Sequence, residues 1–117
     1  MKSKNKDKLF KEWLKTLDYF YSWYLVIFEK KMMELKDRFE KSVTDSKNLA
    51  EKPGNEILLQ LYSLYKQATE GDVNTEPPAN PFDFVNKAKH DAWSGLKGKS
   101  KEEAMEEYVD LVERLKG

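Results

Sequence analysis

Residues 9–39 read LFKEWLKTLDYFYSWYLVIFEKKMMELKDRF, and this stretch decides the fold class. It contains neither Pro nor Gly, and its apolar residues recur every three or four positions, which is the spacing of one helix face. The series is Phe10, Trp13, Leu17, Phe20, Tyr24, Phe28, Met32, Leu35 and Phe39. The pattern runs from Lys2 to Lys52 and predicts either one helix of about forty residues or two with a bend near 34–37. Pro53-Gly54-Asn55 is expected to end it.

Three more helices are predicted downstream. Asn55 is a candidate N-cap for a helix over residues 55–70, and Gly71 is placed to end it in a left-handed turn. Residues 71–83 hold three prolines and no helical period, so they are predicted to form a loop. A helix is expected over 84–96, and Ser100 with Glu103 forms a capping-box pattern for a last helix through Leu115. Because no strand pattern occurs, the fold class is predicted to be all-α.

Composition excludes several classes of function. The chain has 117 residues, enough for one core, and 21 basic residues balance 21 acidic ones, unlike a typical nucleic-acid binder. With no Cys and one His, neither a thiolate nucleophile nor a Cys- or His-rich metal site is expected, and a reducing, cytoplasmic location fits. Neither a cleavable secretory signal nor a membrane-spanning helix is expected from the apolar run that Asp18 and Glu29 bound.

One helix face carries a mixed set of side chains. Tyr62, Tyr65 and Lys66 stand at i, i+3 and i+4 of the predicted 55–70 helix and therefore share a face. Two phenol rings and an ammonium group suit a flat, anionic ligand such as a ring that carries phosphates. The alternative is a boundary of the core at which the lysine stem passes two half-buried tyrosines. Spacing alone leaves both interpretations open.

Three longer stretches then carry a resemblance. Residues 62–76 read YSLYKQATEGDVNTE, residues 87–93 read KAKHDAW, and residues 96–105 read LKGKSKEEAM. Together they closely resemble the acyl-CoA-binding protein family, and the resemblance runs from about Leu35 to Gly117. It implies a four-helix up-down-down-up bundle over residues 35–117, preceded by a long amphipathic helical extension over residues 1–34. It also implies that the protein binds and carries or buffers long-chain fatty acyl-CoA esters without altering them, with no cofactor.

The resemblance further implies which residues hold the ligand. The tyrosines and lysine of the YxxYK stretch, here Tyr62, Tyr65 and Lys66, would hold the adenine ring and the 3′-phosphate. Lys89 would reach the nucleotide from the third helix, Tyr108 would complete the head-group site, and Lys47 would belong to the phosphate environment. Candidates for the acyl-chain lining are Leu58, Leu59 and Val43, for which a purely structural role in the core is an equal alternative.

This chain departs from the family pattern in places. His90 stands where the family usually has Trp, and the loop around Pro77 is one residue longer than usual. Enzymatic hydrolysis through Ser63, His90 and Asp91 is the rival hypothesis, which a mid-helix serine disfavours, so the protein is predicted not to be an enzyme. A third hypothesis is a scaffold that has lost its ligand.

The extension differs in charge from the rest of the chain. Residues 1–36 carry nine lysines and five acidic residues, a net charge of +4, so the remainder sums to −4. The central run of the extension is apolar on nearly all sides of the predicted helix, so we expect another surface to cover it. Self-association through residues 8–34 is the first interpretation, a peripheral contact with a membrane the second, and packing over the ligand site the third. Trp13 and Trp23, near Lys4, Lys6, Lys8 and Lys11, suit an anionic lipid surface, and equally a dimer core.

Overall fold

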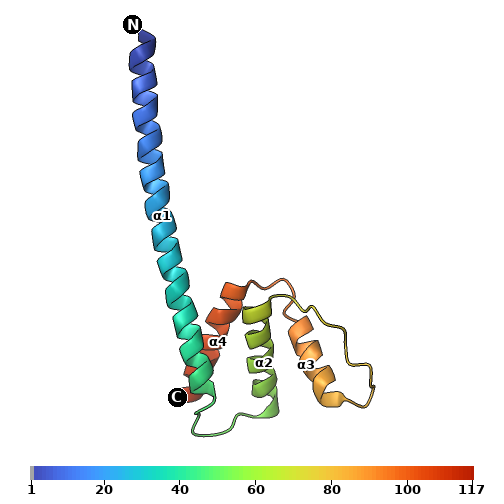
Figure 1. The fold of residues 1–117 in the computed structure, drawn as a ribbon. Coiled ribbons are helices and arrows are strands. Elements are labelled where there is room, and N and C mark those ends of the chain that lie inside the picture. The colour runs from blue at the N-terminus through green and yellow to red at the C-terminus, as the bar shows by residue number, and fades with distance from the viewer. Residues whose placement is uncertain (1) are drawn as a thin grey trace. The chain divides into compact units, whose positions relative to one another are not determined.

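The computed structural model describes the backbone of residues 2–117 and the side chains from Lys6 onward, so the side chain of Lys4 lies outside the described residues. The chain forms four helices, α1 (Lys2–Ser46), α2 (Asn55–Glu70), α3 (Phe84–Ser94) and α4 (Lys101–Lys116), shown in Figure 1. It divides into two compact units, Met1–Glu34 and Leu35–Gly117. The described residues contain no strand, and the all-α prediction is confirmed.

One helix, α1, covers the whole N-terminal pattern, so the predicted choice between one helix and two is settled in favour of one. It ends at Ser46, earlier than the predicted stop at Pro53. The physical reason is local, because Lys47 and Asn48 donate their N–H groups to Thr44 and Asp45 in tight i to i−3 turns. The Asn48 side chain also donates to the carbonyl of Thr44 at 3.2 Å, which satisfies a carbonyl at the helix end.

The ends of the other helices agree with the sequence in part. Gly54, not Asn55, is the N-cap of α2, and it makes no side-chain cap because it has none. Gly71 follows α2 with a φ of 81°, a conformation that glycine adopts readily. Helix α3 ends at Ser94, two residues before the predicted end, because the chain continues in i to i−3 turns. The Ser100 hydroxyl accepts the Glu103 N–H at 3.0 Å, and this predicted cap is confirmed.

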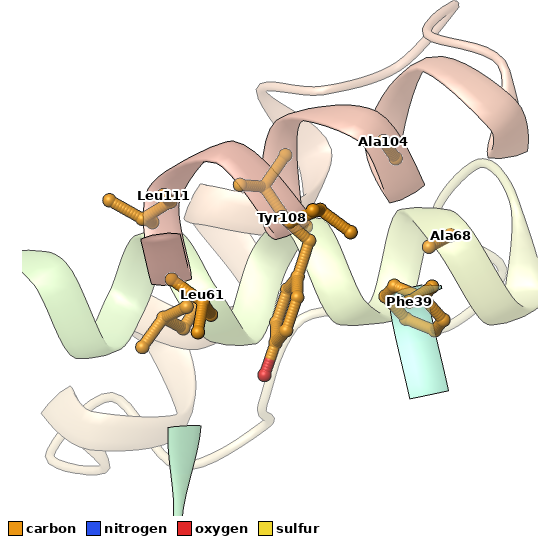
Figure 2. Packing of buried hydrophobic residues seen from close by; sticks show 9 residues of the cluster. Phe39, Leu61, Ala68, Ala104, Tyr108 and Leu111 are labelled. Atoms are coloured by element: carbon orange, nitrogen blue, oxygen red, sulfur yellow. The ribbon is translucent and has the colours of Figure 1, made fainter. Parts of the chain in front are cut away.

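The core lies in the unit Leu35–Gly117, where α2 packs against both α3 and α4. In Figure 1, α2 and α3 run in one direction, while α4 and the end of α1 run in the other, which is the predicted up-down-down-up order. Figure 2 shows how aliphatic and aromatic side chains of α1, α2 and α4 meet. The buried cluster consists of Phe39, Leu61, Leu64, Ala68, Ala104, Tyr108, Val109, Leu111 and Val112.

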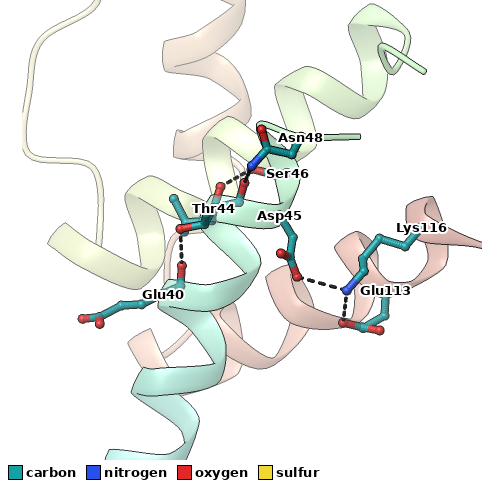
Figure 3. A network of polar contacts seen from close by, with 8 residues as sticks. Glu40, Thr44, Asp45, Ser46, Asn48, Glu113 and Lys116 are labelled. Atoms are coloured by element: carbon teal, nitrogen blue, oxygen red, sulfur yellow. Dashed lines mark hydrogen bonds and ion pairs between the residues drawn. The ribbon is translucent and has the colours of Figure 1, made fainter. Parts of the chain in front are cut away.

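Polar contacts join the end of α1 to α4 (Figure 3). The Lys116 ammonium group lies 3.0 Å from a carboxylate oxygen of Asp45 and 3.4 Å from one of Glu113. The pKa of Lys116 is raised, because the Asp45 and Glu113 carboxylates stabilise its charged form. These contacts are solvent-exposed and therefore add little to stability, but they link the last turn of α1 to the last turn of α4.

A buried glutamine ties the end of α2 to the connection between α3 and α4. The Gln67 amide donates to Asp72 at 2.9 Å and to the carbonyl of Lys99 at 2.7 Å. Asp72 also accepts the Gly98 N–H at 2.9 Å, and the hydrogen bonds from Gly98 and Gln67 lower the pKa of this carboxyl group. The indole N–H of Trp93 donates to the carbonyl of Gly71 at 2.9 Å. The start of the 71–83 loop is thereby held against α3 and against the connection between α3 and α4.

Candidate ligand-binding site

The three residues singled out on α2 point toward two different neighbours. At about 100° per residue, Tyr65 lies some 60° to one side of Tyr62, and Lys66 lies about 40° to the other. Tyr65 is exposed and faces Phe39 of α1, with ring centroids 6.1 Å apart and planes at 22°. Tyr62 and Lys66 are half-buried and meet side chains of α3. The shared face therefore borders on α1 at one edge and on α3 at the other.

In the contact between α2 and α3, a lysine of each helix lies over an aromatic ring of the other. Lys66 Nζ of α2 lies 5.4 Å from the centroid of the Trp93 ring of α3. Lys89 Nζ of α3 lies 5.3 Å from the centroid of the Tyr62 ring of α2. Both distances suit cation–π attraction. We call Tyr62, Lys66, Lys89 and Trp93 the cation–aromatic cluster.

The charge of Lys66 is partly engaged. Its ammonium group lies 3.3 Å from a carboxylate oxygen of Glu70, one turn further along α2, and its side chain is 30% exposed. An ion pair at this level of exposure is weak and exchanges readily with water or a competing anion. Lys66 is therefore held near the cluster and remains available to an anionic ligand.

A small hollow adjoins the cluster between α2, α3 and the 71–83 loop. Its volume is about 170 Å³, and its lining comprises Tyr62, Thr75, Glu76, Pro78, Asn86, Lys89, His90 and Trp93. His90 is half-buried and lies within 2.8 Å of the carbonyl of Thr75 through Nε2, and within 3.4 Å of the Ser94 hydroxyl through Nδ1. His90 thus holds the loop against α3. We call this space the α2–α3 hollow.

A larger hollow opens on the other side of Tyr65. It has a volume of about 470 Å³, and α1, α2 and α4 contribute Lys36, Phe39, Glu40, Val43, Tyr65, Ala68, Thr69, Lys101 and Met105 to its lining. The volume is in the range of small-molecule sites. Phe39, Val43 and Met105 make part of its lining apolar, while Lys36, Glu40 and Lys101 are charged residues of the same lining. We call it the apolar hollow.

The predicted site residues are accordingly divided. Tyr62 and Lys89 line the α2–α3 hollow, whereas Tyr65 and Val43 line the apolar hollow. Lys66 lies beside Trp93 and lines neither hollow. Leu58 and Leu59 are half-buried, Lys47 is exposed in the turn after α1, and none of these three lines either hollow.

Tyr108 lies inside the core. Only 4% of its surface is exposed, and its ring meets Phe39 edge-on with centroids 5.1 Å apart. Its hydroxyl donates to Ser46 at 3.0 Å, joining α4 to the end of α1. Burial raises the pKa of Tyr108, and the hydrogen bond to Ser46 partly offsets that rise. In this position Tyr108 supports Phe39, and through it the apolar hollow.

Sequence reasoning missed several lining residues. Lys36, Phe39 and Glu40 precede the predicted Val43 at helical spacing (i, i+3, i+4 and i+7), so this spacing could have placed them on the same face as Val43. Trp93 belongs to the KAKHDAW stretch, but the pattern alone gives it no role in a site. Lys101 and Met105 come from α4, and no local signal relates them to α1.

The described residues also bear on metal binding and membrane spanning. Among them, no group of His, Cys, Asp or Glu side chains is arranged to hold a metal ion. None of the helices they form has both the length and the apolarity of a membrane span.

Comparisons with known proteins agree on one family. The profile of the family described as "Acyl CoA binding protein" matches residues 36–112. The acyl-CoA-binding protein of Gossypium hirsutum is 48% identical over 83 residues, which are 71% of this chain and 92% of that protein. Enoyl-CoA delta isomerase 2 of Rattus norvegicus is 54% identical over 77 residues, 66% of this chain, but this chain spans only 19% of that protein.

Solved structures give the same result. The crystal structure of Acyl-CoA-Binding Protein 2 of Oryza sativa superposes with a TM-score of 0.68 at 44% identity, covering 72% of this chain and 90% of that one. That of ACBP from Moniliophthora perniciosa has a TM-score of 0.64 at 39% identity, covering 68% and 78%. On the matched profile, the identity over nearly whole relatives and the shared four-helix fold, this chain belongs to the acyl-CoA-binding protein family.

Proposed function

We propose that this protein binds long-chain fatty acyl-CoA thioesters and carries or buffers them without changing them chemically. Membership of the family supports acyl-CoA binding. The observation that carries the proposal is the cation–aromatic cluster, in which two ammonium groups from different helices lie over aromatic rings, while Tyr65 on the same face of α2 lines the apolar hollow. Coenzyme A offers an adenine ring and phosphates to such a cluster, and the acyl chain offers apolar surface.

Because the chain has no net charge, an anionic ligand must be attracted by individual lysines at the site, and not by the overall charge of the protein. Lys66 and Lys89 reach the cluster from α2 and α3, and we assign the 3′-phosphate to them. A well-formed hydrogen bond between an ammonium group and a phosphate contributes about 1.5–3 kcal/mol. We assign the adenine ring to the ring faces of Tyr62 and Tyr65, which lie on the same side of α2. Tyr62 is half-buried and Tyr65 is exposed.

The apolar hollow is the proposed place of the acyl chain. Phe39, Val43 and Met105 provide surface for methylene groups, each of which gains about 0.8 kcal/mol when it is buried. Affinity should therefore increase with chain length until the hollow is filled. Leu58 and Leu59 as lining, and Lys47 and Tyr108 in the head-group site, remain predictions that rest on the resemblance.

The hydrolysis hypothesis requires Ser63 to be activated by His90. The Ser63 hydroxyl instead donates to the carbonyl of Gln60 at 3.0 Å, and Ser63 is buried in the body of α2. The His90 ring is engaged by Thr75 and Ser94. A nucleophile needs a base within hydrogen-bond reach, so a binding role is the better proposal for this site.

We further propose that residues 35–117 form the ligand-binding domain and residues 1–34 an extension of it, and that the protein acts in the cytoplasm. Both hollows draw their linings from residues 36–105, within the proposed domain. Ligand binding should thus be independent of the extension.

Isothermal titration calorimetry of the full chain tests the function. Palmitoyl-CoA should bind at one site, and both coenzyme A and palmitate should bind more weakly, because each offers only half of the contacts. Mass spectrometry of the recovered ligand should find the thioester intact. No heat of binding with palmitoyl-CoA would refute the proposal, and release of coenzyme A in proportion to protein would show an enzyme.

A further inference from the structure

The part of α1 that lies in the first unit, Met1–Glu34, has two chemically different sides. At about 100° per residue, most of the apolar side chains between Leu9 and Phe28 occupy an arc of about 160° that no charged residue between 8 and 30 enters. Trp13, Leu17 and Tyr24 lie near the middle of this arc. The charged side chains of residues 8–30 fall on the opposite side. We call the charge-free arc the apolar sector.

The apolar sector is accessible. The exposed fractions are 58% for Trp13, 62% for Phe20 and 63% for Tyr24, and Leu17 is 44% exposed. A run of large apolar side chains over several helical turns forms a continuous patch of the kind that marks an interaction surface. None of its residues lines either hollow, so acyl-CoA binding does not account for it.

Charge identifies the occupant. Residues 1–15 carry six lysines against Asp7 and Glu12, a net charge of +4, whereas residues 16–30 carry one lysine against Asp18 and Glu29. Residues 1–36 carry a net charge of +4 in a chain whose total is zero. A surface of anionic lipid attracts this basic N-terminal part of the helix, whereas a second copy packed through the apolar sector would leave the lysines facing away from the interface and gain nothing from them.

The shape of the sector supports the same choice. The apolar sector, from Leu9 to Phe28, spans 20 residues, which is fewer than the three to four heptads typical of a coiled coil, and Lys31 then interrupts it. An arc of about 160° is also wider than a two-stranded seam, so a dimer would leave aromatic rings in water. Tyr and Trp side chains favour the boundary between lipid headgroups and acyl chains.

Length decides how such a helix would lie. The uncharged run from Tyr19 to Phe28 is ten residues, about 15 Å of helix, against a hydrocarbon core of about 30 Å. We propose that residues 8–30 of α1 bind in the plane of an anionic lipid surface, with the apolar sector at the headgroup–acyl boundary and the basic N-terminal part of the helix attracted to the negative charge of that surface. This surface is independent of acyl-CoA binding.

A vesicle experiment with the full chain, without acyl-CoA, tests this inference. The protein is floated with vesicles of phosphatidylcholine alone and of phosphatidylcholine with about 30% phosphatidylserine, at about 0.1 M and about 0.5 M salt. We expect at least about tenfold stronger binding to the anionic vesicles at low salt, and a marked loss at high salt. Absence of binding to anionic vesicles would overturn the inference.

Two variants with the same added charge separate insertion from simple attraction. Leu17→Lys places an ammonium group in the middle of the apolar sector, and Ser22→Lys places one on the charged side. We expect Leu17→Lys to weaken vesicle binding at least about tenfold and Ser22→Lys to leave it unchanged or tighten it slightly. Tyr24→Lys, also within the sector, repeats the test in case Leu17→Lys loses helix by circular dichroism.

The remaining outcomes are equally decisive. Equal binding by both lysine variants would show attraction of charge without insertion, which contradicts the proposal. Light scattering of the full chain over a range of concentrations reports self-association. A stable dimer that Leu17→Lys dissociates, without vesicle binding by the parent protein, would make a second copy the occupant of the sector.

Discussion

Lys66→Ala is the substitution that examines the cation–aromatic cluster most closely. Lys66 Nζ lies 5.4 Å from the Trp93 ring and 3.3 Å from Glu70, and its side chain is 30% exposed. A charge-assisted hydrogen bond to phosphate is worth about 1.5–3 kcal/mol, which corresponds to a factor of about 12–150 in Kd. Because the side chain is partly solvated and must give up an ion pair of about 0.3–0.5 kcal/mol, the lower end applies. We expect the Kd for palmitoyl-CoA to rise about tenfold or more.

The competing ion pair supplies a second, opposite test of the same reasoning. Glu70→Gln removes the carboxylate that holds Lys66 and should tighten binding about twofold, the equivalent of about 0.3–0.5 kcal/mol. Lys41→Ala removes an exposed lysine that lines neither hollow and serves as a matched control with no expected effect. All three are measured by calorimetry, with the helix content and the midpoint of thermal unfolding as folding controls. The same Kd in Lys66→Ala and the parent would refute the role given to Lys66.

Three further changes test the fold and its division. Phe39→Ala should lower the free energy of unfolding by about 3–5 kcal/mol in urea titrations, because Phe39 is buried against Tyr65 and Tyr108. Phe10→Ala, at an exposed position, should change the free energy of unfolding by less than about 0.5 kcal/mol. Equal effects of the two substitutions would contradict the assigned core. The pKa of Asp72 is lower in the folded state than its ordinary value of 3.8, so the unfolded chain binds more protons at acid pH. The resulting contribution to stability is present above pH 3.8 and is lost as the pH falls through the folded-state pKa. Asp72→Asn should therefore flatten the acid side of the plot of urea midpoint against pH, and parallel plots for variant and parent would disprove this. Deleting residues 1–34 should leave the Kd for palmitoyl-CoA within about twofold, since both hollows are lined by residues beyond the deletion, and a loss of binding would show that the extension closes the site.

Helix positions follow from sequence wherever the deciding interaction is local. The Ser100 cap depends on a serine and a backbone N–H three residues apart, and this spacing is visible in the sequence. The early end of α1 depends on turns at Lys47 and Asn48 that contain neither Pro nor Gly, so Asn48 is the one residue there whose type is common at helix ends, and it is a weaker signal than Pro or Gly. The predicted end therefore falls at Pro53, the next breaker in the chain.

Gln67 illustrates what amphipathic spacing cannot reveal. A glutamine between Lys66 and Ala68 is expected to face water, yet Gln67 is fully buried in the fold. Its partners, Asp72 and the carbonyl of Lys99, are brought to it by the loop after α2 and by the turns before α4. Burial of a polar side chain becomes favourable only through such partners, and the distant one is set by the tertiary fold.

The same limit applies to the candidate site. The i, i+3, i+4 spacing correctly places Tyr62, Tyr65 and Lys66 on one side of α2. It does not reveal that α1 approaches the edge at Tyr65 while α3 approaches the edge at Lys66, which divides the predicted residues between two hollows. Lys101 and Met105 of α4 likewise join the apolar hollow through packing alone.

The central claim is that Lys66 and Lys89 hold the phosphorylated end of the ligand. Its most direct test compares the Kd of the full chain for palmitoyl-CoA with that for palmitoyl-3′-dephospho-CoA, which lacks only the 3′-phosphate. We predict that removing this phosphate weakens binding at least about tenfold in the parent and less than about twofold in the Lys66→Ala, Lys89→Ala double variant. Equal affinity of the parent protein for the two ligands would contradict the claim.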